Sequence, residues 1–294
     1  LDSCSLYKII DGLLEHYNVL MYDFPGYGMS PLKSNLPSWE ELCTDFKLLT
    51  NYLGLQHYHL IGHDVGGNLS IILANEYPSH VKTITLISTP CFFPIEETRK
   101  YIDFRKRLVN EFGKEKLISN LLPKITLHNE DKEWEVVRKG LEGAALEMHF
   151  HLCHLVAETD WITRLKKTSH PTLVLSGEKD SLFTPYTSRV ASGFIMNSEY
   201  INILDASNMV FIDQPQETLR HINRFLGNTD NYLLTTQLDS FDELEHIQIK
   251  MKEKFKKSHF SIEVSCINFK LLGEFSIHIN DFKIEHGWNK RHAK

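Results

Sequence analysis

The stretch Ile61-Gly62-His63-Asp64-Val65-Gly66-Gly67-Asn68-Leu69-Ser70 decides how this chain of 294 residues is interpreted. It follows a short apolar run, Tyr58–Ile61, and precedes a segment with helical periodicity. Small residues flank one reactive side chain, Asp64, where a strand must turn sharply into a helix. This pattern is typical of a nucleophile elbow, in which the side chain at the tip of a strained turn faces substrate. Glycines are expected there because a Cβ beside the turn would clash with the strand or the helix.

Strands and helices alternate on both sides of the elbow. Short apolar runs predict buried strands at Tyr17–Tyr22, Tyr58–Ile61, Lys82–Ile87, 171–176 and Tyr200–Leu204. Helical patterns are predicted at about 6–16, 38–53, 65–77, 185–194 and 216–226, the second of which opens with the capping box Ser38 to Glu41. This alternation predicts an α/β protein with a mostly parallel sheet and helices on both faces.

Two segments break the alternation. Residues 91–167 contain no predicted strand and four helical stretches, at 96–112, 115–122, 132–143 and 144–158. After Gly227, a lysine-rich helix at 241–257 and alternating apolar residues on either side of Gly273-Glu274 predict a small α+β extension. We therefore divide the chain into a first core part (1–90), a helical cap insertion (91–167), a second core part (168–227) and the extension (228–294).

Composition narrows the classes of function. A net charge of −6 gives no reason to expect nucleic-acid binding, and the expected partner is a small molecule. Five cysteines without a CxxC pair favour a reduced protein, which we predict to be cytoplasmic. No apolar run approaches the roughly 20 residues of a membrane-spanning helix. The histidines lack metal-ligand spacing, so neither a metal nor a cofactor is predicted, and the oligomeric state is left open.

Over about residues 5–226 the chain resembles the α/β-hydrolase superfamily. Four motifs occur in the order of that family: the loop Asp23-x-Pro-Gly-x-Gly-x-Ser30, the elbow Gly62-x-Asp64-x-Gly66, the turn Gly177-Glu-Lys-Asp180, and Asp213-Gln-Pro215 before the last helix. The resemblance implies the α/β-hydrolase fold, with the helical insertion as a cap over the active site. It also implies that Asp180 is the acid of a catalytic triad.

The aspartate at the elbow is most similar to the branch of epoxide hydrolases and dehalogenases. In that branch a carboxylate attacks an electrophilic carbon and forms an alkyl ester, which a histidine-activated water then hydrolyses. An aspartate is ionised at neutral pH, so the first step needs no base. The second step needs one, because the attacking water must lose a proton.

The position of the catalytic histidine is occupied by Asn208, in the segment Asp205-Ala-Ser-Asn208. An amide does not accept a proton at neutral pH, and loss of a general base costs about 10²–10⁴ in rate. Asn208 is then either a group that orients the water or an idle position. Of the 16 histidines, the possible substitute bases are His149, His151 and His154 in the cap and His221 in the last helix. The three cap histidines do not share one helix face, so only His154 is expected to reach the site, and no substitute is favoured.

Two further departures affect substrate binding. Residues 1–16 contain no His-Gly loop, which in the family supplies an oxyanion donor, so the Val65 N–H is the predicted donor. Early strands are also missing, so either the chain is a fragment or the strands in 260–284 cover the exposed sheet edge. Val65 stands where many dehalogenases carry a halide-binding tryptophan, and Tyr101 is the only cap tyrosine. The predicted substrate-binding residues are His63, Val65, Tyr101 and His154.

Two functions follow. The first is a hydrolase of a small organic ester, epoxide or halide, with Asp64 as nucleophile and an activity impaired by Asn208. The second is a pseudoenzyme, a non-catalytic binding or interaction protein that keeps the scaffold. A proton acceptor within about 3 Å of the attacking water would favour the first.

Overall fold

Four parallel strands form the central sheet of the computed structural model, which describes residues 2–227, 249–250, 253, 267–270, 276–279 and 282–283. They lie side by side in chain order: β1 (Tyr58–His63), β2 (Val81–Ile87), β3 (Thr172–Gly177) and β4 (Ser198–Ile203). Strands β2 and β3 are buried almost throughout, as expected for parallel strands covered on both faces. The predicted α/β architecture is confirmed.

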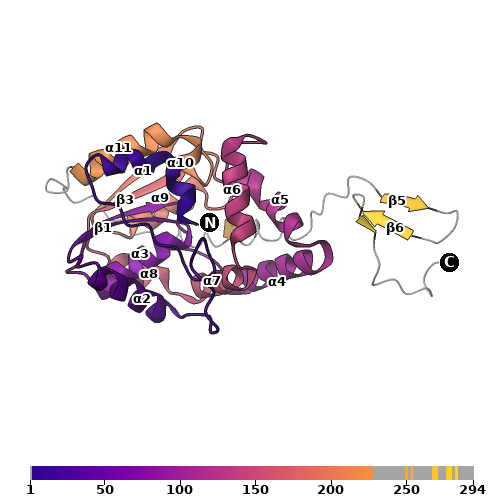
Figure 1. Cartoon of the computed structure of the whole chain (residues 1–294), viewed down its shortest axis with the longest axis horizontal. Coiled ribbons are helices and arrows are strands. Elements are labelled where there is room, and N and C mark those ends of the chain that lie inside the picture. Colours follow the sequence, from indigo (N-terminus) through magenta and orange to yellow (C-terminus); the bar gives the residue numbers. More distant parts are fainter. Residues whose placement is uncertain are drawn as a thin grey trace.

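Helices cover the two faces of the sheet in two groups (Figure 1). One face carries α2 (Trp39–Tyr52), α3 (Val65–Glu76), α8 (Trp161–Lys167) and α9 (Pro185–Gly193). The opposite face carries α1 (Tyr7–Leu14), which follows a short 3₁₀ turn (Ser3–Leu6), together with α10 (Val210–Asp213) and α11 (Pro215–Gly227). The capping box predicted for α2 is present, since the Ser38 hydroxyl accepts from Glu41 N and the Glu41 carboxylate accepts from Ser38 N.

Four longer helices lie between β2 and β3 along the chain. They are α4 (Ile95–Phe112), α5 (Lys114–Ile125), α6 (Lys132–Gly143) and α7 (Leu146–Glu158), and each agrees with a helix predicted from the sequence. Figure 1 shows α4, α5 and α6 to one side of the sheet. Parallel strands place their carboxyl ends at one edge, where ligands bind in open α/β sheets. The insertion is therefore placed to cover that edge.

The strand predicted at Tyr17–Tyr22 is wrong. This segment has no regular secondary structure, and β1 pairs only with β2 among the described strands. Tyr17 and Val19 pack on the core, and the Tyr17 ring lies 5.9 Å from that of His59 on β1. Leu20 and Met21 are 40% and 48% exposed. The apolar run is thus half solvated and forms no backbone ladder, which a buried strand requires.

The described part of the extension contains three antiparallel strands: β5 (Ile267–Lys270), β6 (Ser276–Ile279) and β7 (Phe282–Lys283). They pair with one another and none of them pairs with β1, so the alternative in which strands of 260–284 cover the open sheet edge finds no support among the described residues. The alternation of Ile277 and Ile279 does mark a strand, β6. The strand predicted at 260–264 and most of the helix at 241–257 lie outside the described residues. No helix in the described part of the chain is long and apolar enough to cross a membrane.

Candidate active site

Asp64 occupies a strained turn between β1 and α3. Its backbone has φ 51° and ψ −126°, a conformation that side chains rarely adopt. The turn is held at both ends, because Asp64 N donates to Ile87 O at 3.0 Å and Gly67 N donates to Asp64 O at 3.0 Å. A Cβ on Gly62 would lie 2.3 Å from the Gly66 carbonyl oxygen. The elbow predicted from the glycine spacing is therefore present.

The elbow opens into a cavity of about 380 Å³ between the sheet edge and the cap helices. This volume and its mostly apolar lining suit a small organic ligand. The residues named from the sequence that line it are His63, Asp64, Val65, Tyr101 and Asn208. Asp64 is the only carboxylate among the lining residues that the structure describes. His154 does not line the cavity; its charged neighbours include Lys106 and Glu158.

The first turn of α3 faces the same cavity. Val65 and Gly66 line it, and both belong to the helix that begins directly after Asp64. The first N–H groups of a helix have no acceptor within the helix, and the helix dipole favours negative charge there. The Val65 N–H donates to the Asp64 carboxylate, which lowers the pKa of that group.

Burial raises the pKa of Asp64 to about 6, and the negative charge of Asp180 adds to this effect. The nearby Arg105 guanidinium acts in the opposite direction. At pH 7 the Asp64 carboxyl is therefore still mostly ionised. Asp64 is thus a buried carboxylate that titrates just below neutrality.

Asp180 and Asn208 are brought together as the family pattern implies, although an amide replaces the imidazole. Asn208 Nδ2 donates to Asp180 Oδ2 at 3.1 Å, and Asp180 Oδ1 accepts from the backbone N–H groups of Leu182 and Phe183. Both side chains are buried, which raises the pKa of Asp180. The other end of the amide, Oδ1, lies 2.8 Å from His63 Nε2. Asn208 therefore joins two side chains and has one amide hydrogen left for a ligand.

A close backbone approach places Asn208 beside Asp180. A Cβ on Gly177, at the end of β3, would lie 2.0 Å from the Ser207 carbonyl oxygen, so only glycine fits. Lys179 N also donates to Ala206 O at 2.8 Å. These contacts fix residues 206–208 against the turn that carries Asp180.

Asp213 ties the same loop to the cap. One carboxylate oxygen accepts from Thr126 Oγ1 at 2.7 Å and from Leu127 N at 3.0 Å, and the other accepts from Ser207 N at 2.7 Å. Thr126 and Leu127 directly follow α5, and Ser207 precedes Asn208. One carboxylate thus connects the end of a cap helix to the Asn208 loop.

Asp213→Ala is expected to destabilise the protein by about 2–4 kcal/mol, because it leaves buried donors without an acceptor. Thermal unfolding followed by circular dichroism measures the fall in Tm. The matched control is Asp45→Ala, which removes a surface ion pair with Lys33 and should cost less than about 1 kcal/mol. Equal Tm values for the two variants would contradict the role assigned to Asp213.

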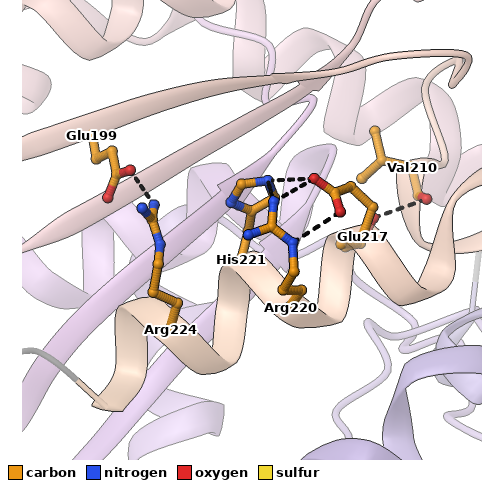
Figure 2. Close-up of polar contacts among 7 residues, drawn as sticks. Glu199, Val210, Glu217, Arg220, His221 and Arg224 are labelled. Atoms are coloured by element: carbon orange, nitrogen blue, oxygen red, sulfur yellow. Dashed lines mark hydrogen bonds and ion pairs between the residues drawn. The ribbon is translucent and has the colours of Figure 1, made fainter.

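No histidine in the described structure takes the place of the missing base. His63 donates its Nε2 hydrogen to Asn208, and burial lowers its pKa to about 4. His149 lines the cavity, but burial and the charge of Arg105 lower its pKa to about 3. Figure 2 shows His221 on α11 beside Glu217 and Arg220. His221 Nε2 lies 2.9 Å from Glu217 Oε1, and Glu217 also forms an ion pair with Arg220. His221 therefore belongs to an ion-pair network on α11.

One group of side chains has the composition of a metal site. His128, Asp131 and Glu133 place potential ligand atoms within 4.8 Å of one another, near the start of α6. Protein contacts account for all three: His128 binds Asp131 at 2.5 Å, Asp131 caps the helix at Trp134 N, and Glu133 pairs with Lys8. We therefore assign no metal to this cluster.

Sequence analysis named the cap residues Tyr101 and, as a possible base, His149, but it missed the two cations that line the cavity, Arg105 and Lys124. A signal was present, since Arg105 is a charged residue in the buried stripe of α4, which consists of Thr98, Ile102, Arg105 and Leu108. Lys124 and His149 also line the cavity, from α5 and α7. The sequence patterns of α4, α5 and α7 did not show that these three helices line one cavity.

Comparison with known proteins agrees with this geometry. The model of a family described as alpha/beta hydrolase fold matches residues 3–215. The pimeloyl-[acyl-carrier protein] methyl ester esterase of Aeromonas hydrophila is 26% identical over 234 residues, which cover 74% of this chain and 89% of the esterase. The 3-oxoadipate enol-lactonase 2 of Acinetobacter baylyi is 25% identical over 206 residues, which cover 69% of this chain and 76% of that protein.

The fold also matches solved structures. An esterase from Thermogutta terrifontis superposes with a TM-score of 0.71 at 23% identity, covering 79% of this chain and 87% of the esterase. An enol-lactonase from Burkholderia xenovorans superposes with a TM-score of 0.68 at 21% identity, covering 77% and 87%. The elbow, the helices inserted between β2 and β3, and the family match over most of the chain lead to one conclusion: this protein belongs to the α/β-hydrolase fold family.

Proposed function

We propose that this protein hydrolyses small esters or lactones with Asp64 as the nucleophile, and that turnover is slow because Asn208 replaces the general base. The observation that carries this proposal is the position of Asp64, a carboxylate at the tip of a strained elbow inside an apolar cavity. The esterase and the enol-lactonase among the relatives support an ester or lactone as substrate. The aspartate itself supports the mechanism of the aspartate branch.

The proposed reaction proceeds in two steps. An ionised oxygen of Asp64 attacks the acyl carbon, and the carbonyl oxygen becomes an oxyanion beside the N–H groups of Val65 and Gly66. The alcohol oxygen then leaves with the electron pair of its bond to the acyl carbon and takes a proton from water. This step leaves a mixed anhydride on Asp64. Attack of water on that anhydride releases the acid and regenerates the carboxylate.

The absence of a base affects two substrate classes differently. Forming the mixed anhydride is unfavourable, because an alkoxide is a much poorer leaving group than a carboxylate, and this also makes turnover slow. Once formed, the anhydride is more reactive than the ester, so water can hydrolyse it without assistance. An epoxide or a halide instead alkylates Asp64 and leaves an ordinary ester, whose hydrolysis depends on a base. Esters are therefore expected to turn over, and alkylating substrates are expected to stop at the first step.

Intact-mass spectrometry after incubation with styrene oxide tests this division. The epoxide ring opens as Asp64 oxygen bonds to its carbon, so the mass is expected to increase by one molecule of probe per chain, with the adduct on the Asp64 peptide. Asp64→Asn is the control and should stay unmodified. An adduct at other residues, or none while esters are hydrolysed, would contradict Asp64 as the nucleophile.

The second candidate is a non-catalytic binding protein, and one observation favours it. The amide of Asn208 is held by Asp180 on one side and His63 on the other, which is a stable arrangement with no group to deprotonate water. This function predicts neither ester turnover nor an adduct with styrene oxide. The two measurements together separate the candidates.

A further inference from the structure

Arg105 is a buried cation on the cap helix α4. Its side chain lines the cavity, and the residue is only 7% exposed. Its guanidinium donates to the Tyr101 hydroxyl and to His149 Nε2, and lies 4.1 Å from the centre of the Tyr101 ring. In the described part of the chain no carboxylate is within ion-pair distance of it, whereas Arg99, Arg138 and Arg164 each pair with a glutamate. Burying a charge without a partner is strongly unfavourable, because the charge loses its contact with water.

The nearest polar groups do not neutralise this charge. His149 accepts a hydrogen bond from Arg105 and is neutral, because burial lowers its pKa to about 3. Tyr101 contributes a hydroxyl and a ring face, which are dipolar. The arrangement holds the guanidinium in place without supplying a negative charge.

A second cation lines the same cavity. Lys124 lies near the end of α5, and its ammonium donates to Asn120 Oδ1 at 2.8 Å. Burial lowers the pKa of Lys124, and the positive charge of Arg105 lowers it further. Among the described lining residues of this mostly apolar cavity, two cations thus accompany a single carboxylate, Asp64.

We propose that Arg105 binds a carboxylate of the substrate, with Lys124 adding attraction, so that the substrates are small esters or lactones that carry an anionic group. This inference rests on the proposed function, because it concerns the same cavity. A planar guanidinium fork matches a carboxylate in two parallel hydrogen bonds. Apolar side chains, including Leu121, Leu152 and Val156, also line the cavity and suit an alkyl chain between the two groups.

A narrower role for Arg105 would be to keep Asp64 ionised, since its charge lowers the pKa of that carboxyl. Such a role changes the reaction of every substrate alike. A carboxylate site instead changes the preference between an anionic substrate and its neutral counterpart. The ratio of the two kcat/KM values therefore distinguishes the roles.

The test uses monomethyl glutarate and the methyl ester of glutaramic acid, which differ only in a carboxylate and a carboxamide. We expect the protein to prefer the anionic ester by about 10- to 100-fold, the effect of one or two charged hydrogen bonds. Arg105→Met is expected to remove most of that preference and to leave only the attraction of Lys124. The matched control is Arg99→Met on the same helix, which removes an exposed pair with Glu158 and should leave the ratio unchanged. A ratio that Arg105→Met does not alter would overturn the proposal.

Ligand binding separates this inference from the proposed function. Titration calorimetry with glutaramate, an inert monoanion, is expected to show binding that weakens about tenfold or more in Arg105→Met. Neutral glutaramide should bind more weakly than glutaramate. If no ester is hydrolysed but this pattern holds, the carboxylate site stands and the proposed hydrolysis does not. Failure of the folded protein to distinguish glutaramate from glutaramide would refute the site, and a Tm measurement confirms that Arg105→Met is folded.

Discussion

Replacing Asp64 with asparagine is expected to lower kcat/KM for a small methyl ester by at least about 10³-fold, close to the uncatalysed rate. Asparagine has the same shape as aspartate and keeps the backbone of the elbow. Its neutral amide oxygen is a poor nucleophile, so the first step fails while the cavity stays intact. Initial rates with a pH indicator measure the loss, and binding of an unreactive ligand checks that the cavity is preserved.

The pH profile is the internal control for this prediction. Asp64 must be ionised to attack, and burial raises its pKa to about 6. Protonation below that pH removes the nucleophile, so kcat/KM is expected to be level above about pH 7 and to fall about tenfold per unit below pH 6. Residual activity of Asp64→Asn should lack this dependence. A wild-type rate that stays constant down to pH 4.5 would exclude Asp64 as the group that attacks.

The parts of the molecule that could be predicted from the sequence are those that depend on local patterns. The elbow needs glycine at defined positions because backbone atoms approach closely there, and Gly62 and Gly177 both show such contacts. Helices of the insertion were located by apolar spacing and caps. The run Tyr17–Tyr22 was misassigned because its apolar composition matches a strand, whereas pairing depends on a neighbour that composition does not specify.

The composition of the cavity could not be predicted because it depends on how the helices meet. Three different helices carry Arg105, Lys124 and His149. In the sequence of its own helix, each of them resembles an ordinary polar residue of an amphipathic pattern. His154 is the cap histidine expected in the cavity, but His149, five residues earlier on the same helix, lies there instead. The contact between Asn208 and His63 joins residues 145 positions apart. Only the tertiary structure brings such groups together.

Asn208→His is expected to raise the turnover of small esters by about 10²-fold, the lower part of the range for a general base. Asn208 already donates from Nδ2 to Asp180 at 3.1 Å, so an imidazole at this position can direct its Nδ1 hydrogen to the same carboxylate. The Nε2 atom of the introduced imidazole is then free to accept a proton from water. His63, which donates to Asn208 in the wild-type protein, needs another acceptor for its Nε2 hydrogen in this variant.

The lifetime of the styrene oxide adduct locates the effect of this substitution. Wild-type protein is expected to hold the alkyl ester on Asp64, whereas Asn208→His should release it and return to its original mass. Asn208→Ala is the matched control, since it removes the same amide without adding a base and should retain the adduct. Asp180→Asn combined with Asn208→His should lose the gain, because the imidazole is no longer held by a carboxylate. If Asn208→His and Asn208→Ala retain the adduct equally, the slow step does not depend on a base at this position.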